Sequence, residues 1–112
     1  MKTSEILDRA ADLITPEGAW CQGAMQRSDG DGLRRPVPRM SYCALGAMYE
    51  VRERTPDPGQ GDDDSATHAL VHFLGLVRGS YVASWNDAPA RKQAEVVAAL
   101  HGAAQREREA GR

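Results

Sequence analysis

The sequence predicts a mainly α-helical fold, a single domain of four helices with space for a short β-hairpin between the first and second. Apolar residues recur at helical spacing in four segments, Pro- and Gly-rich stretches separate these segments, and aromatic residues make up only 5% of the chain. A core built mostly from Leu, Val, Ile and Ala suits close helix packing. We treat residues 1–112 as one domain, with an ordered core over about 4–106 and a frayed C-terminal tail.

The first two helices follow from apolar spacing and from the residues at their ends. The first is predicted from about Ser4 to Ile14, with Thr3 or Ser4 as its N-cap and a Pro-Glu-Gly step after it. The second is predicted from Tyr42 to about Arg54, with Ser41 as its N-cap. Nearby prolines exclude a helix before it, so the segment from Trp20 to Met40 is expected to hold the hairpin and a long loop.

The third helix is predicted from about Ser65 to Arg78, directly after the acidic run Asp62-Asp63-Asp64. Negative charge is favoured at the N-terminal end of a helix dipole. This segment is the most apolar of the chain, and we expect it to be the central element of the core. Its expected buried stripe contains Ala66, Ala69, Leu70, Phe73, Leu74 and Val77.

Trp85-Asn86-Asp87 stands directly before an Ala-Pro-Ala step that opens the last predicted helix, from about Ala88 to Arg106. Asn and Asp are common N-caps, and Pro fits the first turn of a helix. We therefore expect Asn86 or Asp87 to cap the last helix and Trp85 to pin its start to the core. A loop held so firmly is also suited to form the wall of a binding site.

Charge and hydropathy exclude several classes of function. A net charge of −2 provides no basic face for nucleic acid, so a nucleic-acid partner is not expected. No stretch approaches the roughly 20 apolar residues that span a bilayer, and the chain does not begin with the apolar region of a signal peptide. We expect a cytoplasmic protein without a membrane partner, in which Cys21 and Cys43 stay reduced. The oligomeric state stays open.

The expected binding site lies where three rigid segments could meet: the Trp20 segment, the start of the second helix and the Trp85 loop. With no complete catalytic set in the sequence, the preferred function is a non-enzymatic accessory protein that binds a small molecule or a partner protein. The plainer alternative is that both tryptophans are core anchors. The candidate ligand-binding residues are Trp20, Tyr42, Cys43, Trp85, Asn86 and Asp87.

A thiol- or metal-dependent enzyme is the competing function. Cys43 falls near the first turn of a helix, where unpaired N–H groups favour the thiolate, and His68 or His72 could serve as its base with Asp87 orienting it. The same histidines stand four residues apart on one helix face, as zinc ligands can. Cys21, Cys43, His68 and His72 would complete a Cys2His2 set, although neither cysteine belongs to a Cys-x-x-Cys pair. We expect no cofactor, with zinc as the alternative.

A small anion-binding patch is a further option for the long loop. Arg34, Arg35 and Arg39 could bind a phosphate or an acidic partner, although Asp29 and Asp31 offset their charge.

Three motifs together resemble a known family. They are Gly18-Ala19-Trp20, Cys43-Ala44-Leu45-Gly46-Ala47 and Trp85-Asn86-Asp87 before an Ala-rich helix. This combination is similar to a small, uncharacterised domain family of unknown function from actinobacteria and their phages. The resemblance covers roughly residues 6–104 and implies a one-domain cytoplasmic protein in a phage or host-accessory setting. It implies no activity.

Overall fold

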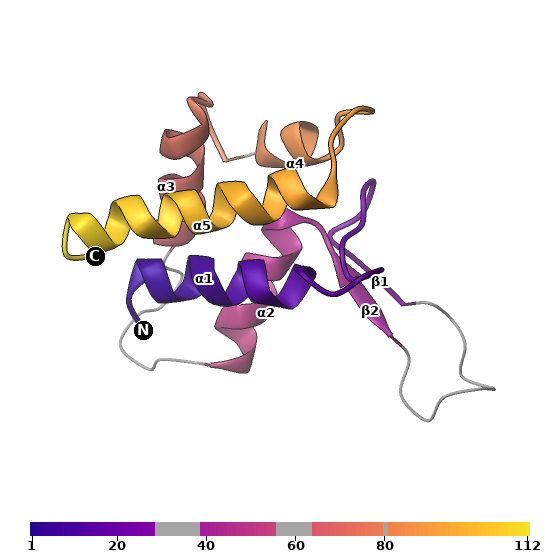
Figure 1. Cartoon of the computed structure of the whole chain (residues 1–112), viewed down its shortest axis with the longest axis horizontal. Helices are drawn as coiled ribbons and strands as arrows, with labels where there is room; N and C mark the ends of the chain where they lie inside the picture. Colours follow the sequence, from indigo (N-terminus) through magenta and orange to yellow (C-terminus); the bar gives the residue numbers. More distant parts are fainter. Residues whose placement is uncertain (29–38, 56–63, 80) are drawn as a thin grey trace.

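The computed structural model describes residues 1–28, 39–55, 64–79 and 81–112 (Figure 1). The fold is mainly helical, as predicted, and the described residues form five helices and one small antiparallel sheet. In chain order the elements are α1 (Thr3–Ile14), β1 (Gln26–Ser28), β2 (Met40–Tyr42), α2 (Ala44–Arg54), α3 (Ser65–Leu74), α4 (Tyr81–Asn86) and α5 (Gln93–Glu109).

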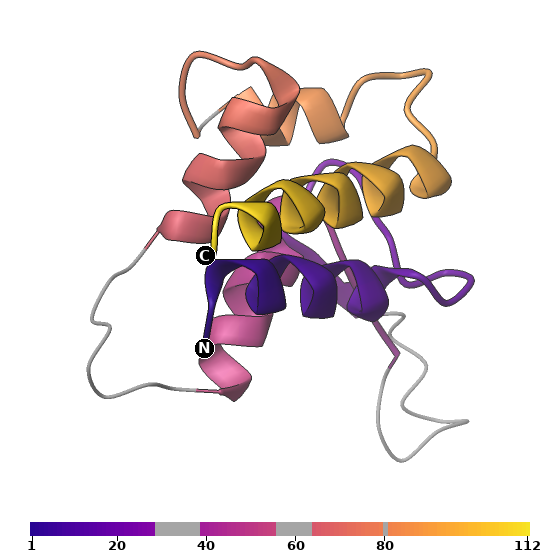
Figure 2. The same cartoon turned by 60° about the vertical axis from the view of Figure 1, so that its left-hand side comes forward.

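The two terminal helices form the longest packed seam of the molecule. α1 and α5 run side by side in opposite directions, so the N- and C-termini lie together at one end (Figures 1 and 2). The Ser4 backbone N–H and Oγ both donate to the Arg112 carbonyl, at 3.3 and 2.9 Å. Small residues let two helix backbones approach closely, and both helices bury such residues. These buried alanines are Ala10, Ala11, Ala99, Ala103 and Ala104.

α2 completes the core beneath this seam, and α3 covers one end of it (Figure 2). Met48 and Val51 are buried on α2, whereas α3 contributes little more than Ala66, Ala69 and Leu70. The prediction that the third helix is the central element was therefore wrong.

α3 is shorter than predicted because it ends at a glycine C-cap. Gly75 has φ 72°, and the Leu76 N–H donates back to the Val71 carbonyl at 2.9 Å. Two residues of the expected buried stripe are consequently at the surface: Phe73 is 37% exposed and Val77 is 80% exposed.

The predicted hairpin is present and sits at the end of α1. β1 and β2 pair antiparallel, with Gln26 opposite Tyr42. On the other edge of β2, Trp20 forms a parallel bridge with Tyr42, through Tyr42 N–H to Ala19 O at 2.9 Å and Cys21 N–H to Tyr42 O at 3.1 Å. β2 is thus flanked on both sides.

The segment around Trp85 differs most from its prediction. Trp85 and Asn86 lie inside α4, and α5 begins only at Gln93, after an extended Lys92 with φ −115° and ψ 151°. The start of α5 is closed by Glu95, whose Oε1 accepts the Lys92 N–H at 2.8 Å. Asn86 and Asp87 therefore do not cap the last helix.

Other expected caps are also replaced. α1 starts behind Lys2, and neither Thr3 nor Ser4 caps it: the Thr3 hydroxyl donates to Ser65 Oγ at 2.8 Å. α2 starts behind Cys43, because Ser41 belongs to β2. Asp64 is the N-cap residue of α3 but makes no side-chain cap bond, and Asp62 and Asp63 lie outside the described residues. In the described ranges, no helix is both long and apolar enough to cross a membrane.

Candidate functional site

One fully buried asparagine joins three segments that are far apart in the sequence. Asn86 is 0% exposed, and its Oδ1 accepts the Trp20 indole N–H at 2.8 Å and the Ala44 backbone N–H at 3.0 Å. Its Nδ2 donates to the Cys21 carbonyl and to Asp87 Oδ1, both at 3.0 Å. A carboxamide has two donors and two acceptor lone pairs, so the hydrogen-bonding capacity of this side chain is filled.

A second layer of bonds surrounds this amide. Gln22 Nε2 donates to the Asn86 and Ala88 carbonyls, both at 3.0 Å, and Asp87 Oδ1 accepts the Gly23 N–H at 3.0 Å. We call the whole arrangement the asparagine clasp. It consists of Trp20, Cys21, Gln22, Gly23, Ala44, Asn86 and Asp87.

The start of α2 explains the spacing of Cys43 and Gly46. The Cys43 Sγ accepts the Gly46 N–H at 3.4 Å, and the Cys43 N–H donates to the Met25 carbonyl at 3.1 Å. The Met25 backbone lies so close to α2 that a Cβ on Gly46 would be 1.8 Å from the Met25 oxygen. The close approach of the loop therefore requires glycine at position 46, and the Cys43 sulfur acts as the N-cap acceptor of α2.

Cys43 is unsuited to attack a substrate that arrives from solvent. It is 3% exposed, and burial raises the pKa of its thiol although two backbone N–H groups at the helix start act in the opposite direction. The sequence had predicted a lowered pKa, and this was wrong because burial outweighs the helix terminus. In the described part of the chain no hydrogen bond joins Cys43 to His68 or His72.

The four proposed zinc ligands are not assembled. His68 and His72 line a surface hollow beside α3 with Val71 and Leu76, and His72 Nε2 lies 3.5 Å from an Arg106 nitrogen. Within residues 1–28, 39–55, 64–79 and 81–112, no three His, Cys, Asp or Glu side chains are grouped so that they could hold a metal ion. Cys21 and Cys43 lie at the clasp.

Five of the six predicted ligand-binding residues do come together. Trp20, Asn86 and Asp87 belong to the clasp, and Tyr42 and Cys43 adjoin it, because Tyr42 is bridged to Trp20 and Cys43 precedes Ala44. Tyr42 and Cys43 are each only 3% exposed, and the Asn86 amide is fully buried. Tyr42, Cys43 and Asn86 are therefore closed to a ligand, whereas Trp20 is partly exposed and Asp87 is exposed. The hydrogen bonds of the clasp make it a structural joint.

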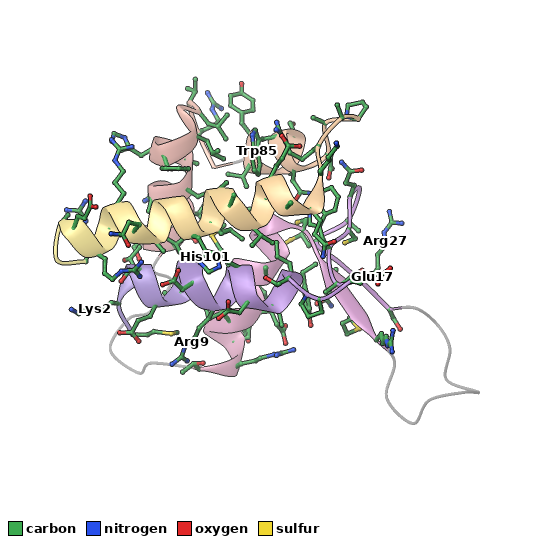
Figure 3. The ribbon with its side chains drawn as sticks, viewed as in Figure 1. Lys2, Arg9, Glu17, Arg27, Trp85 and His101 are labelled. Carbon is green, nitrogen blue, oxygen red and sulfur yellow. The ribbon has the colours of Figure 1, made fainter. Side chains whose placement is uncertain are left out.

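Trp85 is not part of the clasp; it is partly buried and packs against the hydrophobic core, as expected from the sequence. The Arg91 guanidinium carbon lies 4.3 Å from the centre of the Trp85 ring, and Arg91 Nε donates to the Trp85 carbonyl at 3.0 Å. Figure 3 shows the Trp85 side chain at α4, above the start of α5. Stacking of this kind fixes the turn between α4 and α5.

Beside the clasp lies a pocket that the sequence did not indicate. We call it the α2–α3 groove; its volume is about 130 Å³, and Met25 at 49% exposure and Tyr49 at 55% stand beside it. Arg52 and Asp64 form an ion pair at its border, at 3.2 Å. The lining residues are Met25, Leu45, Met48, Tyr49, Arg52, Asp64, Ala66 and Thr67.

The available sequence signal for this groove was Tyr49. It lies off the buried stripe of the second helix, so it could be recognised as an exposed aromatic. The position of Met25 could not be inferred, because it depends on a loop that is fixed by hydrogen bonds to distant residues. Arg34 and Arg35 of the predicted anion patch lie outside the described residues; Arg39 lines a separate open hollow near Met40.

The fold and its joint define a small helical protein in which the motif residues hold three distant segments together. The chain belongs to a family described as Family of unknown function (DUF6197), whose profile matches residues 1–106. No curated protein and no solved structure matches the chain.

Proposed function

We propose that this protein is a non-catalytic accessory module that binds a partner protein through the α2–α3 groove. The observation that carries the proposal is an apolar pocket flanked by two large exposed side chains, Met25 and Tyr49. Exposed apolar side chains that gather around a pocket are typical of interaction sites.

The size of the groove favours a protein over a small molecule. Pockets for drug-sized ligands measure about 300–1,000 Å³ and enclose most of the ligand. At about 130 Å³ the α2–α3 groove holds roughly one large apolar side chain. Three wider hollows of about 360, 420 and 460 Å³ are more open to solvent and would leave a small molecule largely exposed.

The types of residue around the groove also favour a protein partner. Tyr, Met and Arg are enriched in the cores of protein interfaces, and an anchor residue inserted into a pocket often supplies much of the binding energy. Tyr49 and Met25 would cover such an anchor, while the Arg52–Asp64 pair offers charged groups at the border for polar contacts.

The asparagine clasp supports this surface by fixing Met25. The Met25 carbonyl is held by the Cys43 N–H, and its backbone rests on Gly46. The clasp anchors the preceding residues of the same loop, so one wall of the groove is held before a partner arrives. Preorganisation of this kind lowers the entropic cost of binding.

The cellular setting is part of the proposal. A basic content dominated by Arg, with Lys2 and Lys92 as the two lysines, supports a GC-rich actinobacterial or phage source, as do the three motifs. A cytoplasmic location is consistent with unpaired Cys21 and Cys43. Thiol or metal catalysis is not part of the proposed function, because Cys43 is buried and, among the described residues, makes no hydrogen bond to His68 or His72.

The test is affinity capture from cells that encode the protein, with Tyr49→Asp compared with a matched control, Tyr81→Asp. Tyr81 is also an exposed tyrosine on a helix, at 45%, but it lies on α4 away from the groove. We expect Tyr49→Asp to reduce the recovered partner at least tenfold and Tyr81→Asp to leave it unchanged. Equal recovery with both variants would refute the groove as the binding surface.

Native mass spectrometry of the purified protein separates the remaining possibilities. A partner-binding module should appear without a retained small molecule or metal. A small molecule that stays bound to the wild type and is lost in Tyr49→Asp would replace the protein partner by a small ligand.

A further inference from the structure

We propose that Cys21 and Cys43 are an oxidisable pair that closes into an intramolecular disulfide when the protein meets a peroxide. This inference is independent of the partner-binding proposal, because it concerns the clasp and needs no ligand in the groove.

The backbone register brings the two residues side by side. Trp20 and Tyr42 form a parallel bridge with hydrogen bonds on both sides of it, and each cysteine directly follows one of these residues. Cys43 keeps extended geometry, with φ −79° and ψ 177°. Beyond the bridge, the Asn86 amide bonds to both the Cys21 carbonyl and the Ala44 N–H and so holds the two chain segments beside each other at Cys21 and Cys43.

Neighbouring strands generally lie about 4.8 Å apart, a spacing that suits a disulfide. Bonded cysteines have Cα atoms about 4.4–6.8 Å apart. Successive side chains of a strand alternate between its faces, so Cys21 and Cys43 share the face opposite Trp20 and Tyr42. Both are free thiols, and the electrostatic effect of Cys21 on the pKa of Cys43 also reflects their closeness.

The Cys21 and Cys43 thiols differ in their accessibility to an oxidant. Cys21 is partly exposed and its Sγ donates to the Ala24 carbonyl at 3.5 Å, so an oxidant can reach it. Cys43 is 3% exposed, accepts the Gly46 N–H and is shielded from small reagents. Cys21 is therefore the thiol that reacts first, and Cys43 is the resolving thiol.

The chemistry balances with hydrogen peroxide as the oxidant. The Cys21 thiol loses its proton and attacks one peroxide oxygen, which gives a sulfenic acid and one water. The Cys43 thiol then loses its proton and attacks the Cys21 sulfur; the S–O bond breaks, the S–S bond forms and a second water leaves. In sum, two thiols lose two hydrogen atoms and one peroxide is reduced to two waters.

The bond would tie the Trp20 segment covalently to the start of α2. These are two of the segments that the Asn86 amide joins by hydrogen bonds. Closing the chain between residues 21 and 43 also restricts the unfolded state, so the oxidised protein should melt at a higher temperature than the reduced one.

The experiment uses the full chain, reduced and then exposed to hydrogen peroxide, with free thiols alkylated under denaturing conditions. We expect the intact mass to fall by two hydrogen atoms. Trypsin should release peptides 10–27 and 40–52 as a linked pair, since arginines at 9, 27, 39 and 52 bound them. Cys21→Ser should leave Cys43 unoxidised, and Cys43→Ser, which keeps an N-cap oxygen for α2, should stop at the sulfenic acid.

An equilibrium measurement tests the geometry itself. In glutathione redox buffers, the effective concentration of the two thiols should be at least about tenfold higher in the folded protein than in denaturant. An equal or lower value in the folded protein would overturn the proposal. It would also be overturned if Cys21 proceeded to the sulfinic acid while Cys43 stayed a free thiol, or if Cys21 only linked two chains together.

Discussion

At the residue scale, Asn86 is the side chain on which the arrangement of the clasp depends. Asn86→Ala would leave the Trp20 indole N–H, the Ala44 N–H and the Cys21 carbonyl without their partner. A buried polar group left unpaired costs about 1–3 kcal/mol, so we expect a loss of at least about 3 kcal/mol in the free energy of unfolding. Urea denaturation followed by tryptophan fluorescence measures it.

The matched control is Gln105→Ala. Gln105 is also a carboxamide, but it is exposed on α5 and its amide bonds join it to Glu109 and Arg108 on the same helix. Its loss should change the free energy of unfolding by less than about 0.5 kcal/mol. A similar small change for Asn86→Ala would mean that water replaces the buried bonds at little cost.

The capping chemistry of Asn86 could be predicted from the sequence, but the helix it serves could not. Its Oδ1 does accept a free N–H at a helix start, that of Ala44 on α2, instead of one on the helix that follows it. Local sequence signals report what a side chain can bond, whereas the partner depends on how distant segments pack. The same reason explains why Cys43 was placed at a helix start correctly while its pKa was predicted in the wrong direction.

At the scale of elements, the glycine of α2 decides how closely the loop can pack on the helix. In an exposed helix interior, Gly→Ala stabilises by about 1 kcal/mol. In Gly46→Ala the new Cβ would meet the Met25 carbonyl oxygen at 1.8 Å, and backbone cannot move aside without breaking the Cys43–Met25 bond. We expect Gly46→Ala to lower the free energy of unfolding by about 2 kcal/mol or more.

Gly102→Ala on α5 is the control for helix propensity. Its Cβ would lie 2.4 Å from the end of the Phe73 ring, which is 37% exposed and can turn away. The gain in helix propensity and the cost of displacing the Phe73 ring nearly cancel. We therefore expect the free energy of unfolding, measured by heat or urea, to change by less than about 1 kcal/mol. Equal destabilisation by both substitutions would show that the Met25 loop is not held against α2.

The helices themselves were predictable where one apolar stripe is long enough. α1 and α2 end where the sequence indicated, and α3 begins where it did. α4 was missed because six residues cannot form a stable helix alone, and it is held by burial of Val82 and Asn86. The groove was missed for a related reason, since it lies between two elements and a loop that no periodicity connects.

At the scale of the whole molecule, charged side chains cross the seam between α1 and α5. His101 Nδ1 lies 2.8 Å from Asp8 Oδ1, and Arg108 donates to the other oxygen of Asp8. Figure 3 shows His101 between the two helices. Partial burial alone would raise the pKa of Asp8, but the hydrogen bonds from His101 and Arg108 outweigh it and hold this pKa below its usual value.

A lowered pKa makes the seam sensitive to acid. An Asp whose pKa is lower in the folded state contributes stability above its unfolded pKa of about 3.9, and this is lost as the pH falls through the folded pKa. We expect Asp8→Asn to lower the free energy of unfolding by up to about 1 kcal/mol near pH 7; the loss is limited because the side chain is 31% exposed. As the pH falls, the free energy of unfolding should decrease less steeply in this variant than in the wild type. The control is Asp12→Asn, because the Asp12 side chain is 75% exposed. Between pH 7 and 2 its free energy of unfolding should fall as steeply as that of the wild type.

The clasp and the α2–α3 groove should be coupled, because the loop from Trp20 to Met25 belongs to both. Asn86 does not line the groove, yet Asn86→Ala should weaken binding of the captured partner about tenfold, or about 1.4 kcal/mol, at a temperature where the variant is still folded. Tyr49→Asp should weaken binding without changing the free energy of unfolding, since its ring is exposed. Titration of each purified variant with the partner separates the two cases. Unchanged affinity in Asn86→Ala would show that the clasp stabilises the fold without positioning Met25, and the groove would then owe its shape to α2 and α3 alone.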